Sequence, residues 1–171
     1  MRFRSPNPEQ TRAAARLLGS VLDDRGLLIS LVGDLGVGKT VFVKGLAEGL
    51  GIEPAGVASP TFVICSEYPT PAGHTLAHVD LYRVKHLVEL EAVGFDDLLE
   101  PGTVVAVEWG DRFPEALPLD HLEIEILCPD PLTNPARRDL HALSCGPASS
   151  AVLARWTEAL DQAKPTVEYR N

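Results

Sequence analysis

The chain has 171 residues, of which 45% are hydrophobic and 23% charged, and its net charge is −9 at pH 7. No apolar run approaches the length of a membrane span and the polar first residues show no secretory signal, so we expect a cytoplasmic globular domain with no membrane partner. The acidic balance argues against direct nucleic-acid binding, which needs clustered lysines and arginines, so another subunit is expected to hold any RNA.

The first predicted elements are a helix, a strand and a second helix. Asn7 and Pro8 are expected to be the cap and first residue of the first helix, with Gln10 completing a pattern similar to a capping box. The apolar run at 27–32 predicts a buried strand. Residues 41–50 then carry apolar side chains at helical spacing, which predicts the second helix.

The link between that strand and the second helix fits the phosphate-binding pattern GxxxxGK[ST] at residues 33–40. Its glycines allow a tight turn in which N–H groups and the helix N-terminus face phosphate oxygens. Lys39 is expected to reach the β- and γ-phosphates of a nucleotide, and the Thr40 hydroxyl to bind Mg²⁺. The predicted nucleotide-binding residues of this loop are Asp34, Leu35, Gly36, Val37, Gly38, Lys39, Thr40 and Val41.

The later elements predict a mixed sheet. Residues 59–68 and 76–82 read as strands in an antiparallel hairpin, because the link between them is short. A polar, partly helical stretch at 84–99 precedes a buried strand at 103–107. Further strands are predicted at 122–127 and 140–145, and a last helix capped by Ser149 or Ser150 is predicted to run through Leu160.

These elements predict an α/β fold: a P-loop NTPase-like three-layer sandwich whose sheet mixes parallel and antiparallel strands. One domain is expected over residues 1–163, followed by a flexible tail at 164–171. The cysteines, Cys65, Cys128 and Cys145, are widely spaced in apolar segments, and we expect them to be buried free thiols.

Two acidic residues end apolar strands. Asp80 follows Leu-Ala-His-Val and Glu108 follows Val-Val-Ala-Val. Active sites of open α/β sheets lie at the carboxyl ends of strands, so we expect both acids to face the phosphate loop. Glu108 has the cleaner Walker-B-like run and is assigned to the Mg²⁺ shell, and Asp80 to water orientation or general-base work. The competing interpretation is an ion pair of either acid with Arg83 or Arg112.

Together these motifs resemble the bacterial TsaE (YjeE) family. The resemblance rests on the phosphate loop at 33–40, Ser-Pro-Thr-Phe at 59–62, His-Val-Asp-Leu-Tyr-Arg at 78–83 and Glu108-Trp109. It implies an Mg²⁺-dependent ATPase needed for threonylcarbamoyladenosine (t6A) formation at position 37 of tRNAs that read ANN codons. The implied cofactors are ATP and Mg²⁺, and the implied partners are TsaD and its paralogue TsaB, with tRNA reached only through the complex.

The resemblance also implies roles for single residues. Asp80 would be catalytic, beside Lys39, whose catalytic role follows from the phosphate-loop motif, and Thr40 and Glu108 would bind Mg²⁺. Thr61 would lie in a switch-like loop.

Other positions would approach the nucleotide. Thr11 and Trp109 are implied to lie near it, as is an arginine before a late strand. Arg137 and Arg138 both qualify, and Arg138 is preferred because Asp139 and Leu140 follow it as the family spacing suggests.

The chain departs from the family pattern after Glu108-Trp109. Many members have proline there, whereas this chain has Gly110, Asp111 and Arg112. The local backbone and the roles of Asp111 and Arg112 therefore stay open.

Plain structural roles compete for several of these residues. Trp109 is alternatively a core aromatic residue, and Thr61 is alternatively an ordinary strand residue. Tyr82 and Arg83 are alternatively anchors for the loop that follows them.

Three other functions compete with the ATPase. The sequence lacks the NKxD element with which GTPases usually read guanine, which argues against a GTPase switch. A small-molecule kinase needs a lid, for which only the pair Arg137-Arg138 is a candidate. A nucleotide-binding adaptor that does not hydrolyse ATP is compatible with the motifs, because Asp80 and Glu108 would then serve binding alone.

Overall fold

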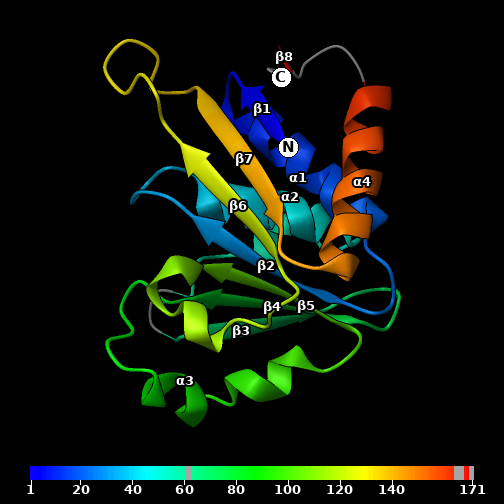
Figure 1. Ribbon diagram of the computed structural model, residues 1–171, viewed down its shortest axis with the longest axis vertical. Helices are drawn as coiled ribbons and strands as arrows, with labels where there is room; N and C mark the ends of the chain where they lie inside the picture. The colour runs from blue at the N-terminus through cyan, green and yellow to red at the C-terminus, as the bar shows by residue number, and fades with distance from the viewer. Residues whose placement is uncertain (61–62, 164–167, 170–171) are drawn as a thin grey trace.

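The computed structural model describes residues 1–60, 63–163 and 168–169 (Figure 1). Within these residues, none of the helices combines the length and the apolar character that crossing a bilayer requires. Thr61 lies outside the described residues. Of the predicted tail at 164–171, only the two residues of β8 are described.

The described strands form one mixed sheet in the order β3-β4-β5-β2-β6-β7-β1-β8. β2 lies between β5 and β6 and is parallel to both, and β4 is parallel to β5. The pairs β3–β4, β6–β7, β1–β7 and β1–β8 are antiparallel, which confirms the predicted hairpin and mixed sheet. The strands are β1 Arg2–Ser5, β2 Leu27–Val32, β3 Cys65–Pro69, β4 Thr75–Asp80, β5 Thr103–Glu108, β6 Leu122–Leu127, β7 Arg138–Ser144 and β8 Glu168–Tyr169.

Helices cover the two faces of the sheet unequally. α1 (Pro8–Val21), α2 (Lys39–Gly49) and α4 (Pro147–Gln162) share one buried cluster with β2, β5, β6 and β7. On the other face, α3 (Val88–Ala92) and the 3-10 turn η2 (Phe95–Leu99) pack on β4 and β5, and Figure 1 shows α3 at the far end of the molecule from α4. The predicted three layers are therefore confirmed. Three further 3-10 turns are η1 Pro54–Gly56, η3 Gly110–Arg112 and η4 Pro114–Ala116.

The backbones of α1 and α2 pack directly against each other behind the phosphate loop. A Cβ placed on Gly45 would lie 2.2 Å from the carbonyl oxygen of Arg12, and one on Gly49 would lie 2.1 Å from that of Arg16. Glycine is therefore required at both positions for this approach. The contact fixes α2, whose first residue is Lys39, against the rest of the fold.

Several predicted boundaries are confirmed. β2 and β6 have the predicted bounds, and Asn7 caps α1 by accepting a hydrogen bond from the Gln10 N–H at 2.9 Å. The strand predicted at 59–68 begins only at Cys65, where pairing with β4 starts. β4 ends at Asp80 because the Asp80 carboxylate accepts the Tyr82 N–H at 2.9 Å, which turns the chain.

Other predictions were wrong or incomplete. The strand predicted at 140–145 is β7, which begins at Arg138, and β1 was not predicted because it offers one apolar residue, Phe3, in four. Cys65 and Cys128 are half-buried free thiols, but Cys145 is exposed, so its predicted burial was wrong. Burial raises the pKa of the Cys65 thiol to about 11.

α4 is capped mainly from another loop, and the prediction that Ser149 or Ser150 is its cap residue was wrong in position, because Ser149 lies inside the first turn, where its Oγ accepts the Gly146 N–H at 2.9 Å. Its N-cap is Gly146. Asp120 accepts hydrogen bonds from the N–H groups of Ala148 at 2.7 Å and Ser149 at 2.9 Å, which satisfies donors that a first turn leaves open. A Cβ on Gly146 would lie 2.3 Å from the Asp120 Cγ, so the glycine makes room for this carboxylate.

Replacing Asp120 with alanine is expected to lower the free energy of unfolding by about 1 kcal/mol at neutral pH, the usual cost of a lost cap. Burial raises the pKa of Asp120, but hydrogen bonds from Ser149 and Ala148 outweigh burial and hold the pKa below its ordinary 3.8. The cap therefore stabilises the fold fully when the pH is above 3.8, the ordinary pKa of aspartate. This stabilisation is lost as the pH falls through the pKa that Asp120 has in the folded protein. Urea unfolding across this range should show the difference from wild type shrinking in acid, and equal stabilities at neutral pH would contradict the cap.

Candidate functional site

A cavity of about 620 Å³ opens where β2, β4 and β5 end. Parallel strands bring their carboxyl ends to one edge of the sheet, so the phosphate loop and both strand-end acids converge there. The predicted site residues that line the cavity are Leu35, Gly36, Gly38, Lys39, Thr40, Val41, Asp80, Glu108 and Trp109. Asp34 and Val37 belong to the same loop but not to the cavity wall.

The phosphate loop adopts backbone conformations that favour glycine. Gly33, Gly36 and Gly38 have φ values of +142°, +75° and +112°. A Cβ on Gly33 would lie 2.4 Å from the carbonyl oxygen of Ile126, whereas one on Gly36 would meet no described atom within 4 Å. The loop is therefore packed against β6 at its start and open at its tip, where a ligand can approach the backbone.

Lys39 lies across this loop and is only 4% exposed. Its Nζ donates to the carbonyl oxygens of Gly33 at 2.6 Å and Asp34 at 2.9 Å, and it lies 3.6 Å from the ring centroid of Trp109. Burial lowers the pKa of Lys39, and the charge of Glu108 is the largest opposing influence. The ammonium is held by neutral groups, so a phosphate is a stronger partner for it than those it has here.

Glu108 connects three elements at the floor of the cavity. It ends β5 directly opposite Asp80 of β4 and is 4% exposed. Its Oε1 accepts a hydrogen bond from Thr40 Oγ1 of α2 at 2.7 Å and lies 2.9 Å from His78 Nε2 of β4. A hydroxyl and a carboxylate therefore already meet at the start of α2.

This donor set fits Mg²⁺. Hard oxygen atoms are its ligands, and Mg²⁺ is usually held by one or two protein oxygens together with phosphates and water. Among the residues described, no group of three or more His, Cys, Asp or Glu side chains is placed to hold a metal ion. Thr40 and Glu108 therefore fit an ion that arrives with a phosphate ligand, and the site does not fit a metal cage made of protein alone.

Asp80 is held by neighbours on both oxygens. Ser59 Oγ donates to its Oδ2 at 2.9 Å, and the Tyr82 N–H donates to its Oδ1 at 2.9 Å. Arg112, considered as an ion-pair partner, instead donates to the carbonyl oxygens of Leu81 and Tyr82. Arg112 thus ties the turn after β4 to η3, which answers the question that the sequence left open about it.

Trp109 is the non-glycine residue with a positive φ, +64°, among the described residues. Such strain is typical of functional sites. Its ring contacts Tyr82 with 5.2 Å between centroids. At the next position, a Cβ on Gly110 would lie 2.2 Å from Ser30 Oγ, so a side chain there would require Ser30 to shift.

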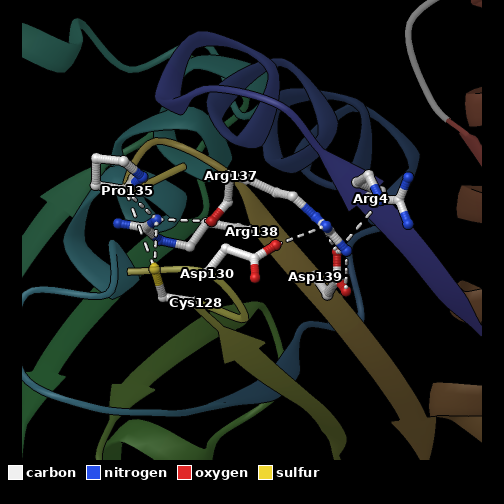
Figure 2. Close-up of polar contacts among 7 residues, drawn as sticks. All are labelled: Arg4, Cys128, Asp130, Pro135, Arg137, Arg138 and Asp139. Atoms are coloured by element: carbon white, nitrogen blue, oxygen red, sulfur yellow. Dashed lines mark hydrogen bonds and ion pairs between the residues drawn. The ribbon is translucent and has the colours of Figure 1, made fainter. Parts of the chain in front are cut away.

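The neighbouring Arg137 and Arg138 point in opposite directions (Figure 2). Arg137 forms ion pairs with Asp139 at 2.8 Å and Asp130 at 3.1 Å. Arg138 donates through Nε to the carbonyl oxygen of Val37 in the phosphate loop. Arg138 therefore braces the loop from outside the cavity, and the preference for it over Arg137 stays a prediction that this contact supports.

Thr11 is a further predicted site residue that does not line the cavity. It is 1% exposed, and its hydroxyl forms a 2.7 Å hydrogen bond with Ser5 Oγ. This contact joins α1 to β1, a strand that the sequence did not reveal. A direct nucleotide contact by Thr11 therefore has no support from this geometry.

Some cavity residues were missing from the predicted site. They are Ser59, Pro60, Val63, Ile64, Tyr82 and Arg83. The sequence pointed to most of these residues, because they belong to the two motifs at 59–62 and 78–83. A motif does not show which of its side chains turn toward the phosphate loop.

Comparison with known proteins decides the family. The family model described as "Threonylcarbamoyl adenosine biosynthesis protein TsaE" matches residues 5–134. This chain belongs to the TsaE family. The resemblance inferred from the motifs is thereby confirmed.

Several TsaE relatives share most of the chain. The tRNA threonylcarbamoyladenosine biosynthesis protein TsaE of Bacillus subtilis is 42% identical over 126 residues, which cover 74% of this chain and 77% of the relative. That of Aquifex aeolicus is 45% identical over 102 residues, covering 58% and 68%. The crystal structure of Bacillus subtilis YdiB is similar with a TM-score of 0.68 and 31% identity over 92% of this chain and 94% of that one, so the likeness extends to the whole fold.

Proposed function

We propose that this TsaE-family chain is an Mg²⁺-dependent ATPase that serves t6A formation at position 37 of tRNAs reading ANN codons. The observation that carries the proposal is the 2.7 Å contact between Thr40 and Glu108 on the floor of the phosphate-loop cavity. The names of the relatives support the tRNA modification, because they describe t6A biosynthesis proteins.

Each residue of the cavity then has a chemical role. The loop N–H groups and the start of α2 bind the phosphates of ATP, and Lys39 exchanges its carbonyl contacts for the β- and γ-phosphate oxygens. Thr40 and Glu108 hold Mg²⁺, which neutralises phosphate charge when it is bound. Asp80, fixed by Ser59, orients the attacking water and accepts its proton.

Protein partners are the second part of the proposal. Leu35, Val63 and Tyr82 line the cavity and are 70%, 58% and 45% exposed. Apolar side chains gathered at one opening are typical of protein contact surfaces. We assign this face to TsaD and TsaB in the cytoplasm, with tRNA reached only through that complex because the chain carries a net charge of −9.

The geometry is less favourable to a small kinase. Arg138 binds a carbonyl of the phosphate loop, so it does not supply a lid over the cavity. An adaptor that binds ATP without hydrolysis uses the same contacts, and turnover distinguishes it from an ATPase.

The two acids provide the test. Glu108→Gln is expected to weaken Mg²⁺-dependent ATP binding by about tenfold or more and to reduce turnover, because it removes the charge of a metal ligand. Asp80→Asn is expected to reduce kcat by about 10²-fold or more while changing ATP affinity little, because water positioning acts on the chemical step. ATP binding titrated with Mg²⁺ and steady-state phosphate release measure these effects.

Glu123→Gln is the matched control, because Glu123 lies on β6 and does not line the cavity. It should behave as wild type. Exchanged phenotypes would reverse the roles of the two acids, and wild-type turnover in both variants would contradict the ATPase site.

A further inference from the structure

We propose that His78 is a positioning residue that fixes the Glu108 carboxylate for Mg²⁺, an inference that rests on the proposed metal site. His78 lies on β4 and is fully buried, with 0% exposure. Its Nε2 lies 2.9 Å from Glu108 Oε1. Because Glu108 is the assigned ligand, a group that holds its carboxylate sets how the metal is received.

The fold places His78 directly beneath the cavity. Side chains alternate along a strand, so Leu76, His78 and Asp80 share one face of β4. Leu76 is buried in the core cluster shared with α1 and α2, and Asp80 lines the cavity. His78 therefore stands between the apolar core and the acidic edge of the site.

The hydrogen bonding of the ring identifies its task. The Glu108 carboxylate accepts hydrogen bonds, so the short contact assigns the imidazole proton to Nε2. Nδ1 is buried and has no hydrogen-bond partner among the described residues. A histidine that only stabilises the core is expected to pair both of its buried ring nitrogens. Here Nε2 contacts Glu108, and Nδ1 has no partner in the part of the chain that the structure describes.

The second donor on Glu108 shows why this contact matters. Oε1 accepts hydrogen bonds from Thr40 on α2 and from His78 on β4. Thr40 is itself assigned to the metal, so its hydroxyl has a second task when ATP binds. The His78 imidazole has no such task and can keep its hydrogen bond to Glu108. Outer-shell hydrogen bonds of this kind orient ligands, and their loss typically costs 10–100-fold in metal affinity or activity.

Methionine and glutamine provide a matched pair of replacements. The two side chains have similar length and volume, but only glutamine carries an amide donor at the position of Nε2. His78→Met is expected to lower the gain in ATP affinity on adding Mg²⁺ by about tenfold, and His78→Gln is expected to keep most of that gain. ATP affinity in EDTA should be unchanged in both variants, because the phosphate loop is intact.

The Mg²⁺ gain separates positioning from packing. If His78 only filled the core, His78→Met and His78→Gln would show the same Mg²⁺ gain. Equal gains in the two variants, or a wild-type gain in His78→Met, would overturn the inference. Wild type and Glu108→Gln measured beside them distinguish the failures: absence of any Mg²⁺ gain in wild type removes the metal site and the role of His78 together.

A measurement on the wild-type chain covers the case in which a variant does not fold. With ¹⁵N-labelled histidine, NMR should show a slowly exchanging Nε2–H tautomer for His78 in the metal-free protein and with Mg²⁺ and ATP. Sequential assignment identifies the His78 resonance, and Glu108→Gln should then shift it. An Nδ1–H tautomer, or a resonance that Glu108→Gln does not move, would overturn the inference.

Discussion

Replacing Lys39 with alanine is expected to reduce ATP turnover at least about 10²–10³-fold, the usual cost of removing a group that stabilises transition-state charge. The Lys39 ammonium is buried at the N-terminus of α2 and is held by two loop carbonyls and the Trp109 ring. Those partners are neutral, so the charge is free to follow the γ-phosphate during transfer. Steady-state phosphate release with saturating ATP and Mg²⁺ measures the loss.

Lys44→Ala is the matched control for this variant. Lys44 lies on the same helix but does not line the cavity, so the substitution makes the same change of charge away from the site. Its turnover should match wild type. If Lys39→Ala also turned over ATP at the wild-type rate, the phosphate-loop assignment would fail.

The parts of the site that the sequence predicted depend on local patterns. The phosphate loop requires glycine at particular positions, and its strand and helix carry clear hydrophobic patterns. The strand-end positions of Asp80 and Glu108 follow from apolar runs, and parallel pairing then places the two acids side by side. Local chemistry and sheet topology were therefore sufficient for the centre of the site.

The parts that the sequence did not reveal depend on contacts between distant segments. Asp120 caps a helix that begins 27 residues later at Pro147, and no local pattern announces such a cap. The strand β1 is recognisable through its pairing with β7 and β8 rather than from its own residues. Thr11 was assigned to the nucleotide from the family resemblance, but its hydroxyl bonds to Ser5 of β1.

Side-chain direction was the second limit. Arg137 and Arg138 are neighbours in sequence, yet their ion pairs and carbonyl contacts lie on opposite sides of the strand start (Figure 2). Gly110 illustrates the same point, because only the position of Ser30 Oγ shows what a side chain there would meet. Such facts depend on packing in three dimensions and leave little trace in a single sequence.

Partner-dependent turnover is the second large effect that we expect. Lys39 is a buried cation of the cavity wall, whereas Arg83 on the same wall is exposed, so its charge is weakened by solvent. A partner that covers the exposed apolar rim would exclude water and add transition-state charge, which in other P-loop systems is worth about 10³–10⁵ in rate. The acidic chain suits a basic partner surface, so the stimulation should weaken at high ionic strength.

The most direct test of the account is phosphate release from ATP and Mg²⁺ by the purified chain, alone and with the TsaD–TsaB pair. We predict slow release by the chain alone, strong stimulation by the pair, and loss of both the basal and the stimulated rate in Lys39→Ala but not in Lys44→Ala. The stimulated rate should fall as salt is raised. Full-speed hydrolysis by the isolated chain that TsaD and TsaB leave unchanged, or ATP-dependent assembly with no turnover at all, would contradict the account.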